Sequence, residues 1–254
     1  MIVRERNDQF VMIEQHHHAS ISGKLFTYLK EDFLPESKWK EDIEFAIFHH
    51  DCGWIPFDEA PFWDDKSNTP YSFTSLPKAP KTVLYENGIN KVEEHSMYAA
   101  LLCSNHYSTF MNRHSIKPAE NFIEREKLRQ ERLRKKIHGF QEDAFNLHYK
   151  LVKFFDDFSL YICLNEPGVQ KEKEHPFFKK GIPLPDSFGD DLLKIRWNSE
   201  SEISIDHTLF YSPEINIQLK QKVLSKANII KNGLIKTYEA AESETVNIRI
   251  LSSV

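Results

Sequence analysis

Two short segments near the start of the chain are rich in side chains that bind metal ions. Residues 14–23 read EQHHHASISG and residues 49–54 read HHDCGW. Imidazole and carboxylate groups together suit Mn, Fe, Co, Ni or Zn, whereas Mg and Ca prefer oxygen ligands alone. The segments therefore predict a site for a divalent transition metal that holds one ion or two.

Single polar residues interrupt the apolar faces of several segments with helical periodicity. Four of them fall where a core side chain is expected: His18, His50, His106 and Asp156. One buried histidine is more often a hydrogen-bonded core residue than a ligand, and an unpaired buried polar group costs about 2–7 kcal/mol. A shared cation satisfies four such residues together, so we expect them to converge on a metal ion.

The histidine triplet offers more than one candidate ligand. Helical phase places His18 on one face with Ile21 and Leu25. His17 lies one position away and His16 two, so both are alternative ligands. We expect His18 to bind the ion.

Two adjacent aspartates are candidates for the last ligand. Asp156 follows Val152 by four residues and precedes Leu160 by four, which places it on the apolar face. Asp157 follows Lys153 by four, the spacing of an ordinary surface ion pair. Asp156 is therefore the expected ligand and Asp157 the alternative.

The elements that must position these residues follow from periodicity. Helical patterns begin at residue 16 and continue over 37–53, 96–113 and 119–164, and alternation predicts a hairpin in the first 14 residues and strands at 193–197, 203–209, 215–219 and 246–251. We predict a mainly α fold with a helical metal-binding core at 15–165. Residues 1–14 and 190–254 would form a small β-rich accessory sheet packed on this core as one structural unit.

Residues 54–81 hold five prolines among six aromatic side chains. Disordered segments are poor in aromatic residues, and long ordered loops in compact domains are usually functional. We expect this loop to cover a pocket. It adds candidate pocket acids, Asp58 and Asp64, and candidate phosphate contacts, Lys78 and Lys81.

Composition narrows the classes of function. The net charge of −5 does not favour a nucleic-acid or anionic-membrane partner, and the basic run at 124–136 is interspersed with acids, which is typical of a solvated helix face. The three cysteines form no CxxC pair, and no apolar run approaches the ~20 residues that span a bilayer. We expect a cytoplasmic protein without a membrane partner. A homo-oligomer is compatible with this composition.

The order of these motifs resembles a known superfamily. A His-Asp pair on a helix, with a histidine from an earlier helix and an aspartate from a later one, is similar to the HD-domain superfamily of helical, metal-dependent phosphohydrolases. A bacterial family of unknown function with an HD-like fold is also similar over most of the first 165 residues, through QHHHASISG, FHHDCGW, TPYSF, SNHY and DDFSLYIC. The resemblance implies an HD-domain-like helical bundle.

The resemblance also implies roles for individual residues. His18 would be the first ligand, His50 and Asp51 the central pair, and Asp156 the closing aspartate. His106 would hold a second metal or contact phosphate. Asp51 and His106 are the residues that we expect to act in catalysis.

The function that follows is hydrolysis of a small phosphorylated molecule, such as a nucleotide-like phosphoester, by metal-activated water. Two alternatives stay open. The first is a di-iron oxygenase on the same scaffold. The second is a non-catalytic, metal-containing protein that binds a ligand or a partner protein.

Overall fold

The structure is a computed structural model that describes residues 1–34, 38–111, 116–189 and 192–252. Its α-helices are α1 (Gln15–Phe26), α2 (Lys40–His49), α3 (Ile55–Glu59), α4 (Lys78–His95), α5 (Met97–Met111), α6 (Lys117–Lys136), α7 (Glu142–Leu164), α8 (Lys226–Asn232) and α9 (Leu234–Ala240). Short 3-10 helices lie at Glu31–Phe33, Cys52–Trp54, Lys171–Lys173 and Asp186–Phe188.

The strands are β1 (Ile2–Glu5), β2 (Gln9–Ile13), β3 (Trp63–Asp64), β4 (Thr69–Pro70), β5 (Ile182–Pro183), β6 (Leu192–Leu193), β7 (Ile195–Ser199), β8 (Glu202–Ile205), β9 (Glu214–Ser225) and β10 (Ser243–Ser252). Six of them form a sheet in the order β1-β2-β9-β10-β8-β7. The pair β10–β8 is parallel and the other neighbours are antiparallel. Because β2 pairs with β9, with Phe10 opposite Leu224, the expectation that the N-terminal hairpin joins the C-terminal strands is confirmed.

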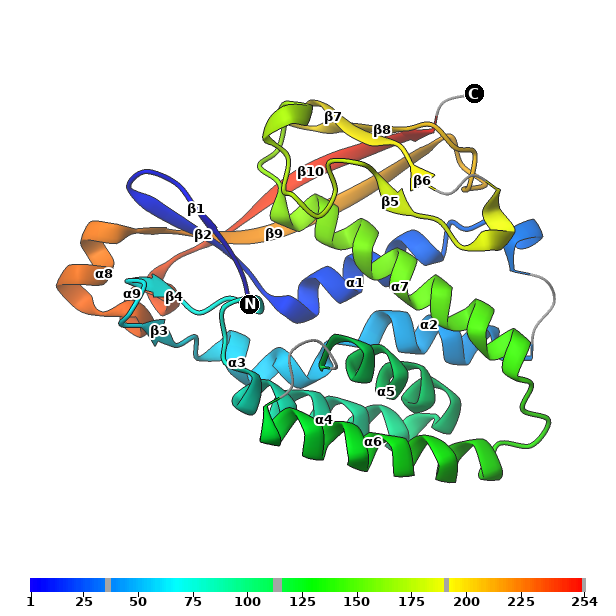
Figure 1. The fold of residues 1–254 in the computed structure, drawn as a ribbon. Helices are drawn as coiled ribbons and strands as arrows, with labels where there is room; N and C mark the ends of the chain where they lie inside the picture. Colours follow the sequence, from blue (N-terminus) through cyan, green and yellow to red (C-terminus); the bar gives the residue numbers. More distant parts are fainter. Residues whose placement is uncertain (35–37, 112–115, 190–191, 253–254) are drawn as a thin grey trace.

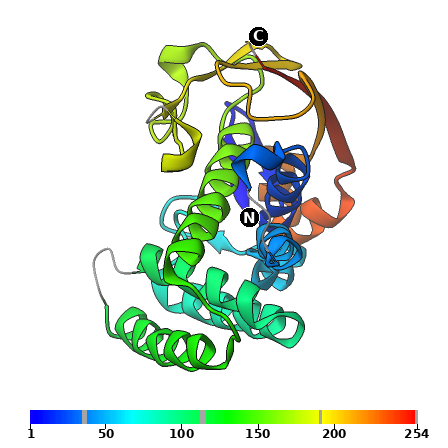
Figure 2. The ribbon, with the colours of Figure 1, turned by 90° about the vertical axis from the view of Figure 1, so that its right-hand side faces the viewer.

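The prediction of a mainly α helical bundle with a small accessory sheet is wrong. The protein is mixed α/β: the six-stranded sheet is large and curled, and two small sheets, β3–β4 and β5–β6, accompany it (Figures 1 and 2). The sequence pattern indicated only residues 215–219 where β9 runs from Glu214 to Ser225. Polar side chains on the solvent face of an antiparallel sheet keep its strands only half apolar, so the strand ends were missed.

The predicted helices at 37–53 and 96–113 correspond to α2 and α5, although Ser37 and Arg113 lie outside the described residues. The stretch 119–164 becomes two helices, α6 and α7. The structure adds α4, a helix for which the sequence pattern provided no expectation. Its apolar residues are few, and only five of its residues are buried: Thr82, Tyr85, Gly88, Ile89 and Val92.

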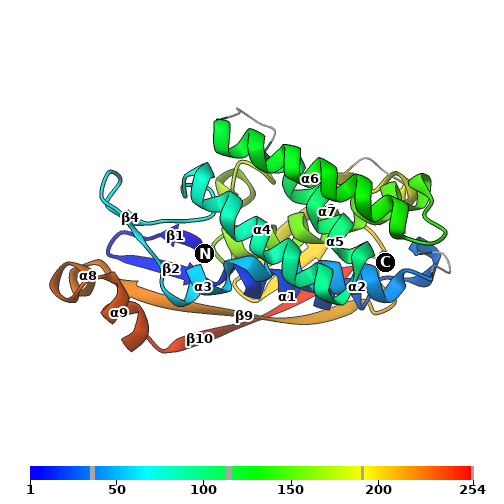
Figure 3. The same ribbon diagram turned by 90° about the horizontal axis from the view of Figure 1, so that it is seen from below.

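Helix α1 lies between the sheet and the other helices. It packs against α2 and α7 on one side and against β9 on the other, whereas α4 and α6 lie furthest from the long strands (Figures 1 and 3). The approach of α1 to α2 is close, because a Cβ atom on Gly23 would lie only 2.2 Å from the Phe48 ring. Glycine at this position therefore lets α1 and α2 bring their histidines together.

A second close approach holds the end of α2 against α4. A Cβ atom on Gly53 would lie 2.1 Å from the main-chain oxygen of Leu84, so only glycine fits there. The residues just before Gly53 are His50 and Asp51. Their place in the fold therefore depends on α4.

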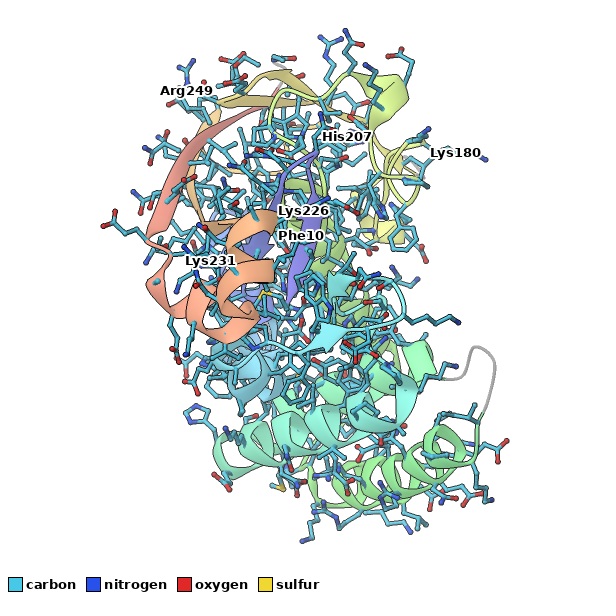
Figure 4. All side chains as sticks on the ribbon, turned by 90° about the vertical axis from the view of Figure 1, so that its left-hand side faces the viewer. Phe10, Lys180, His207, Lys226, Lys231 and Arg249 are labelled. Atoms are coloured by element: carbon cyan, nitrogen blue, oxygen red, sulfur yellow. The ribbon has the colours of Figure 1, made fainter. Side chains whose placement is uncertain are left out.

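The far ends of β9 and β10 carry α8 and α9. There the Lys226 ammonium lies 4.9 Å from the centre of the Phe10 ring, a cation–π contact between the start of α8 and β2 (Figure 4). Among the described residues, none of the helices combines the length and the apolar character needed to cross a bilayer.

Candidate metal centre

Helix α1 positions His18 near its first turn. The Asp58 Oδ2 atom, on α3, accepts the backbone N–H groups of Gln15 at 2.7 Å and His16 at 3.3 Å. A carboxylate at a helix start satisfies free N–H groups and complements the helix dipole. Asp58, a candidate pocket acid in the sequence, therefore acts as the anchor of α1.

The end of α2 explains how two adjacent residues reach one site. Neighbouring side chains on a helix point about 100° apart. The helix ends at His49, and Asp51 has left helical geometry, with φ −104° and ψ 18°. The chain bends here, so the Asp51 carboxylate approaches the imidazole groups.

Helices α5 and α7 supply the other wall of the site. His106 lies on α5 and Asp156 on α7, and α7 also packs against α1. The five side chains are buried, with exposures of at most 4%: His18, His50, Asp51, His106 and Asp156. Four separate elements therefore converge on one enclosed point.

Asp156 lies at the centre of this cluster. Its Oδ1 atom is 3.0 Å from His18 Nε2 and 3.4 Å from His50 Nε2, and its Oδ2 atom is 3.3 Å from His106 Nε2. The carboxylate therefore bridges three imidazole rings from three different helical segments.

Asp51 joins the cluster on the other side of His18. Its Oδ2 atom is 3.5 Å from His18 Nδ1 and 3.9 Å from His50 Nε2. Two groups of potential ligands, each with atoms within 4.8 Å of one another, result: His18–His50–Asp51 and His50–His106–Asp156. These buried groups could hold a metal ion, and His50 belongs to both.

The tautomers of two histidines support this assignment. His18 Nδ1 contacts the main-chain oxygen of Gln15, and His50 Nδ1 lies 2.8 Å from that of Ile47. A carbonyl oxygen only accepts, so both Nδ1 atoms carry a proton, and when the imidazoles are neutral both Nε2 atoms have lone pairs for a metal ion. These Nε2 atoms are 3.3 Å apart and face Asp156.

Buried carboxylates that face imidazoles need a positive charge among them, which is either a proton on an imidazole or a metal ion. The electrostatics of the centre agree. Burial lowers the pKa of His50, but Asp51 and Asp156 outweigh it and raise that pKa to about 9. Burial raises the pKa of Asp156, yet the three imidazoles hold it well below its ordinary value. The site therefore attracts positive charge, which a metal ion could supply.

Tyr107 is a residue of this centre that the sequence analysis missed. Its hydroxyl donates to Asp51 Oδ1 and also contacts the main-chain oxygen of His50. Burial, and then the charge of Asp51, raise the pKa of Tyr107 well above its ordinary value, so it stays a donor. Its ring stacks on Tyr85 at 3.9 Å. The signal in the sequence was its position directly after His106, in SNHY.

The structure separates the members of the histidine triplet. Only His18 belongs to a potential metal-binding group of the described residues. His17 turns to the sheet, where its Nε2 accepts the Lys220 backbone N–H at 2.9 Å, and burial lowers its pKa to about 4. The His16 ring lies 6.1 Å from that of His49.

The two aspartates of α7 also have different partners. Asp156 contacts the three imidazoles, whereas Asp157 accepts a hydrogen bond from Lys153 on the preceding turn. The structure thus places Asp156, rather than Asp157, among the potential ligands.

Two tryptophans of the loop at residues 54–81 pack against different parts of the molecule. Trp54 packs against Tyr85 at 6.0 Å, behind the centre, and Trp63 packs edge-on against Phe10 of β2 at 6.1 Å. Three other loop residues, candidates for a pocket acid or for phosphate contacts, do not belong to the cluster. Asp64 accepts a hydrogen bond from Ser67, Lys81 donates to the Thr74 carbonyl, and Lys78 begins α4.

No curated protein and no solved structure shows significant similarity to the chain. Residues 1–226 match a family described as "Protein of unknown function (DUF3891)". The match includes all five residues of the centre and both β2 and β9, and it ends at the first residue of α8. The chain therefore belongs to the DUF3891 family.

Proposed function

We propose that the protein is a metal-dependent hydrolase of phosphoesters. The observation that carries this proposal is the convergence of three imidazoles and two carboxylates, all buried, on one point. Structural zinc sites are built mostly from cysteines, whereas catalytic sites mix histidine with carboxylate and leave room for water. Here Cys52 and Cys103 have other contacts, the main-chain oxygens of Gly88 and Ala46.

The ligands in this proposal are His18, His50, Asp51 and Asp156, with one or two ions of Mn, Fe, Co, Ni or Zn. When bound, a divalent ion supplies an activated water and a Lewis acid for a phosphoryl oxygen. The pattern of ligands, a His-Asp pair with a preceding histidine and a later aspartate, supports a relation in chemistry to the HD-domain phosphohydrolases.

His106 is suited to move the proton of the reaction. Its Nε2 atom faces Asp156, and its Nδ1 atom is buried without a hydrogen-bond partner among the described residues. Hydrolysis forms a P–O bond to the water oxygen and breaks the P–O bond to the leaving group. The water loses a proton and the leaving oxygen gains one. An imidazole backed by a carboxylate can accept the first and donate the second.

Two overlapping ligand groups also favour a second candidate function. The Nε2 atom of His50 has one lone pair and binds only one ion, but the two oxygens of Asp156 face different imidazoles, so this carboxylate could bridge one ion beside His18 and His50 and another beside His106. Two iron ions would support oxygenase chemistry instead of hydrolysis. We keep this function as the alternative.

Metal analysis of the purified protein tests the proposal. Protein produced with ample metal is compared with His50→Ala and Asp51→Ala, and with His49→Ala as the matched control. His49 stacks on Phe45 and lies outside both ligand groups. We expect stoichiometric transition metal in the wild type and the control, loss of metal in the two variants, and metal-dependent turnover on a panel of phosphoesters.

Three outcomes contradict the proposal in different ways. If wild-type protein produced with ample metal contains no transition metal, the proposed metal centre itself is contradicted. Iron with a mixed-valence spectrum and no phosphoester turnover supports the oxygenase. Bound metal without turnover on a broad panel supports a non-catalytic, metal-containing binding protein.

A further inference from the structure

Exposure rises in steps along the seam between α5 and α7. His106 and Asp156 are at most 3% exposed. The Asp157 side chain is 16% exposed and that of Lys153 43%, and Phe110 is also 43% exposed. Exposure thus increases from the centre towards the surface along this seam, through residues of two neighbouring helices.

Aromatic rings form the outer part of this seam. The Phe110 ring stands edge-on to the His106 ring at 4.7 Å, and the Tyr149 ring lies 6.4 Å from His106. The Tyr149 hydroxyl donates to Thr109 Oγ1 at 3.2 Å, which ties α7 to α5 there. A flat apolar group that enters the seam would therefore meet two aromatic rings next to His106.

The ammonium group of Lys153 belongs to the outer part of the same seam. Lys153 is one turn before Asp157 and donates to it. Burial lowers the pKa of Lys153, but Asp157 and then Asp156 outweigh it and raise that pKa above its ordinary value. The ammonium group therefore stays charged, and with three N–H groups it retains donors for a second anion.

Among the described residues, packed side chains line other sides of the centre. The Tyr85–Tyr107 stack closes the side of α4. The Ser22 hydroxyl donates to Ser159 Oγ at 2.7 Å where α1 meets α7. On the side of α1, the half-buried His16 ring lies 6.1 Å from that of His49.

We propose that substrate reaches the centre along the α5–α7 seam, where Lys153 binds its phosphoryl group and Phe110 and Tyr149 contact a flat, apolar leaving group. The expected substrates are phosphomonoesters of phenol-like alcohols. This inference rests on the proposed function, because it assigns a substrate class to the same centre. Ammonium groups are common ligands of phosphate, and aromatic rings favour edge-on or offset contacts with flat groups.

The test measures binding to the Mn-loaded protein by titration calorimetry, with phenyl phosphate and inorganic phosphate as probes. Lys153→Met is compared with Lys150→Met. Lys150 is the matched control, because it lies on the same helix, is similarly exposed at 45%, and also pairs with an aspartate, Asp186. We expect Lys153→Met to weaken both probes about tenfold, Lys150→Met to leave both unchanged, and Lys153→Arg to retain most of the affinity.

A second pair of variants tests the aromatic contact. Phe110→Ala should weaken phenyl phosphate about fivefold and leave inorganic phosphate unchanged. Phe177→Ala, at an exposed phenylalanine that contacts His175 and Phe178, should change neither. Thermal unfolding of each variant shows that the fold is intact.

The inference is overturned if the wild type binds neither probe or if Lys153→Met behaves like Lys150→Met. Turnover separates this failure from that of the proposed function. If the wild type turns over phosphoesters but the two lysine variants bind the probes equally well, only the proposal about the seam is overturned. Selective loss of phosphate binding in Lys153→Met, without turnover in the wild type, supports the seam and contradicts the hydrolase.

Discussion

The candidate metal centre and the six-stranded sheet differ in whether their polar side chains are buried or exposed. In β9 the apolar residues Ile215, Ile217 and Leu219 are buried, while Asn216 and Gln218 between them are exposed. In the centre, five titratable side chains are buried instead. Burying polar groups costs free energy. A cluster of buried titratable side chains is therefore a candidate for a functional site.

The sheet has one buried charge, and it sharpens this comparison. Arg4 of β1 is buried, yet its Nη2 atom donates to Gln221 Oε1 at 2.6 Å and its Nη1 atom donates to the main-chain oxygen of Asn165. Two of its guanidinium nitrogens thus meet acceptors of the protein itself, and the third, Nε, lies 3.6 Å from Glu166 Oε1. In the centre, by contrast, two buried carboxylates face three imidazoles, and the positive charge among them is a proton or a metal ion rather than a fixed guanidinium. Burial alone therefore does not identify a metal site, but a buried cluster of imidazoles and carboxylates could hold an ion.

The largest expected effect is the loss of metal from the centre. Asp156→Asn removes the carboxylate that bridges three imidazoles, so metal affinity should fall by more than the roughly 10- to 100-fold typical of outer hydrogen-bond partners. Asp157→Asn, one position further, should retain the metal. Competitive titration with a chelator measures both. If the two results are reversed, Asp157 is the ligand.

Removal of the buried charge in the sheet should affect stability instead. Arg4→Met leaves Gln221 and the Asn165 oxygen without their donor, and breaking a buried polar network costs about 3 kcal/mol. Urea unfolding should show this loss while metal content stays at the wild-type level. A fall in metal content of the folded variant would break the distinction between the two regions.

The hydrogen bond to Asp51 should have a smaller effect on the centre. Tyr107→Phe keeps the stacking on Tyr85 but removes the donor to Asp51, so metal affinity should fall roughly 10- to 100-fold. Tyr85→Phe is the control and should retain wild-type affinity. Equal affinities in the two variants would show that the hydroxyl does not position the ligand.

Metal affinity should also depend on pH. Asp51 and Asp156 raise the pKa of His50 to about 9 against the effect of burial, and a ligand imidazole must be neutral. Below pH 9 the ion therefore displaces a proton, and affinity should fall about tenfold for each unit that the pH decreases. Chelator titrations at several pH values measure the slope. A flat profile below pH 9 would contradict a protonated His50 in the metal-free protein.

The smallest effect is expected at the joint between α1 and the sheet. His17→Ala leaves the Lys220 backbone N–H without its acceptor, which costs about 1 kcal/mol. Urea unfolding measures this change, and metal content should not alter. His18→Ala, the adjacent variant, should lose the metal. Loss of metal in His17→Ala would instead indicate that His17 is a metal ligand.

Local patterns carried much of the information about the site. The helical phase of His18 with Ile21 and Leu25 distinguished it from its two neighbours, and the structure places it in a potential ligand group. The same reasoning distinguished Asp156 from Asp157. Such predictions succeed because a helix keeps residues three and four apart on one face, whatever the rest of the fold does.

The sheet shows where local patterns were insufficient. Residues of β9 that face solvent are polar, so the strand is only half apolar, and its pairing with β10 over nine residue pairs involves a distant part of the chain. Register and strand length depend on such partners, which periodicity does not reveal. For this reason the sheet was predicted to be small and the fold mainly α.

The sequence by itself therefore determined which side chains share a face, and with it a set of candidate ligands on four segments. Only the tertiary structure decided how their atoms meet: the bend after His49 that brings in Asp51, the donor from Tyr107, and the unpaired Nδ1 of His106. The physical reason is that periodicity is a property of one element. Distances between lone pairs, in contrast, depend on how several elements pack, and glycines such as Gly23 and Gly53 set that packing.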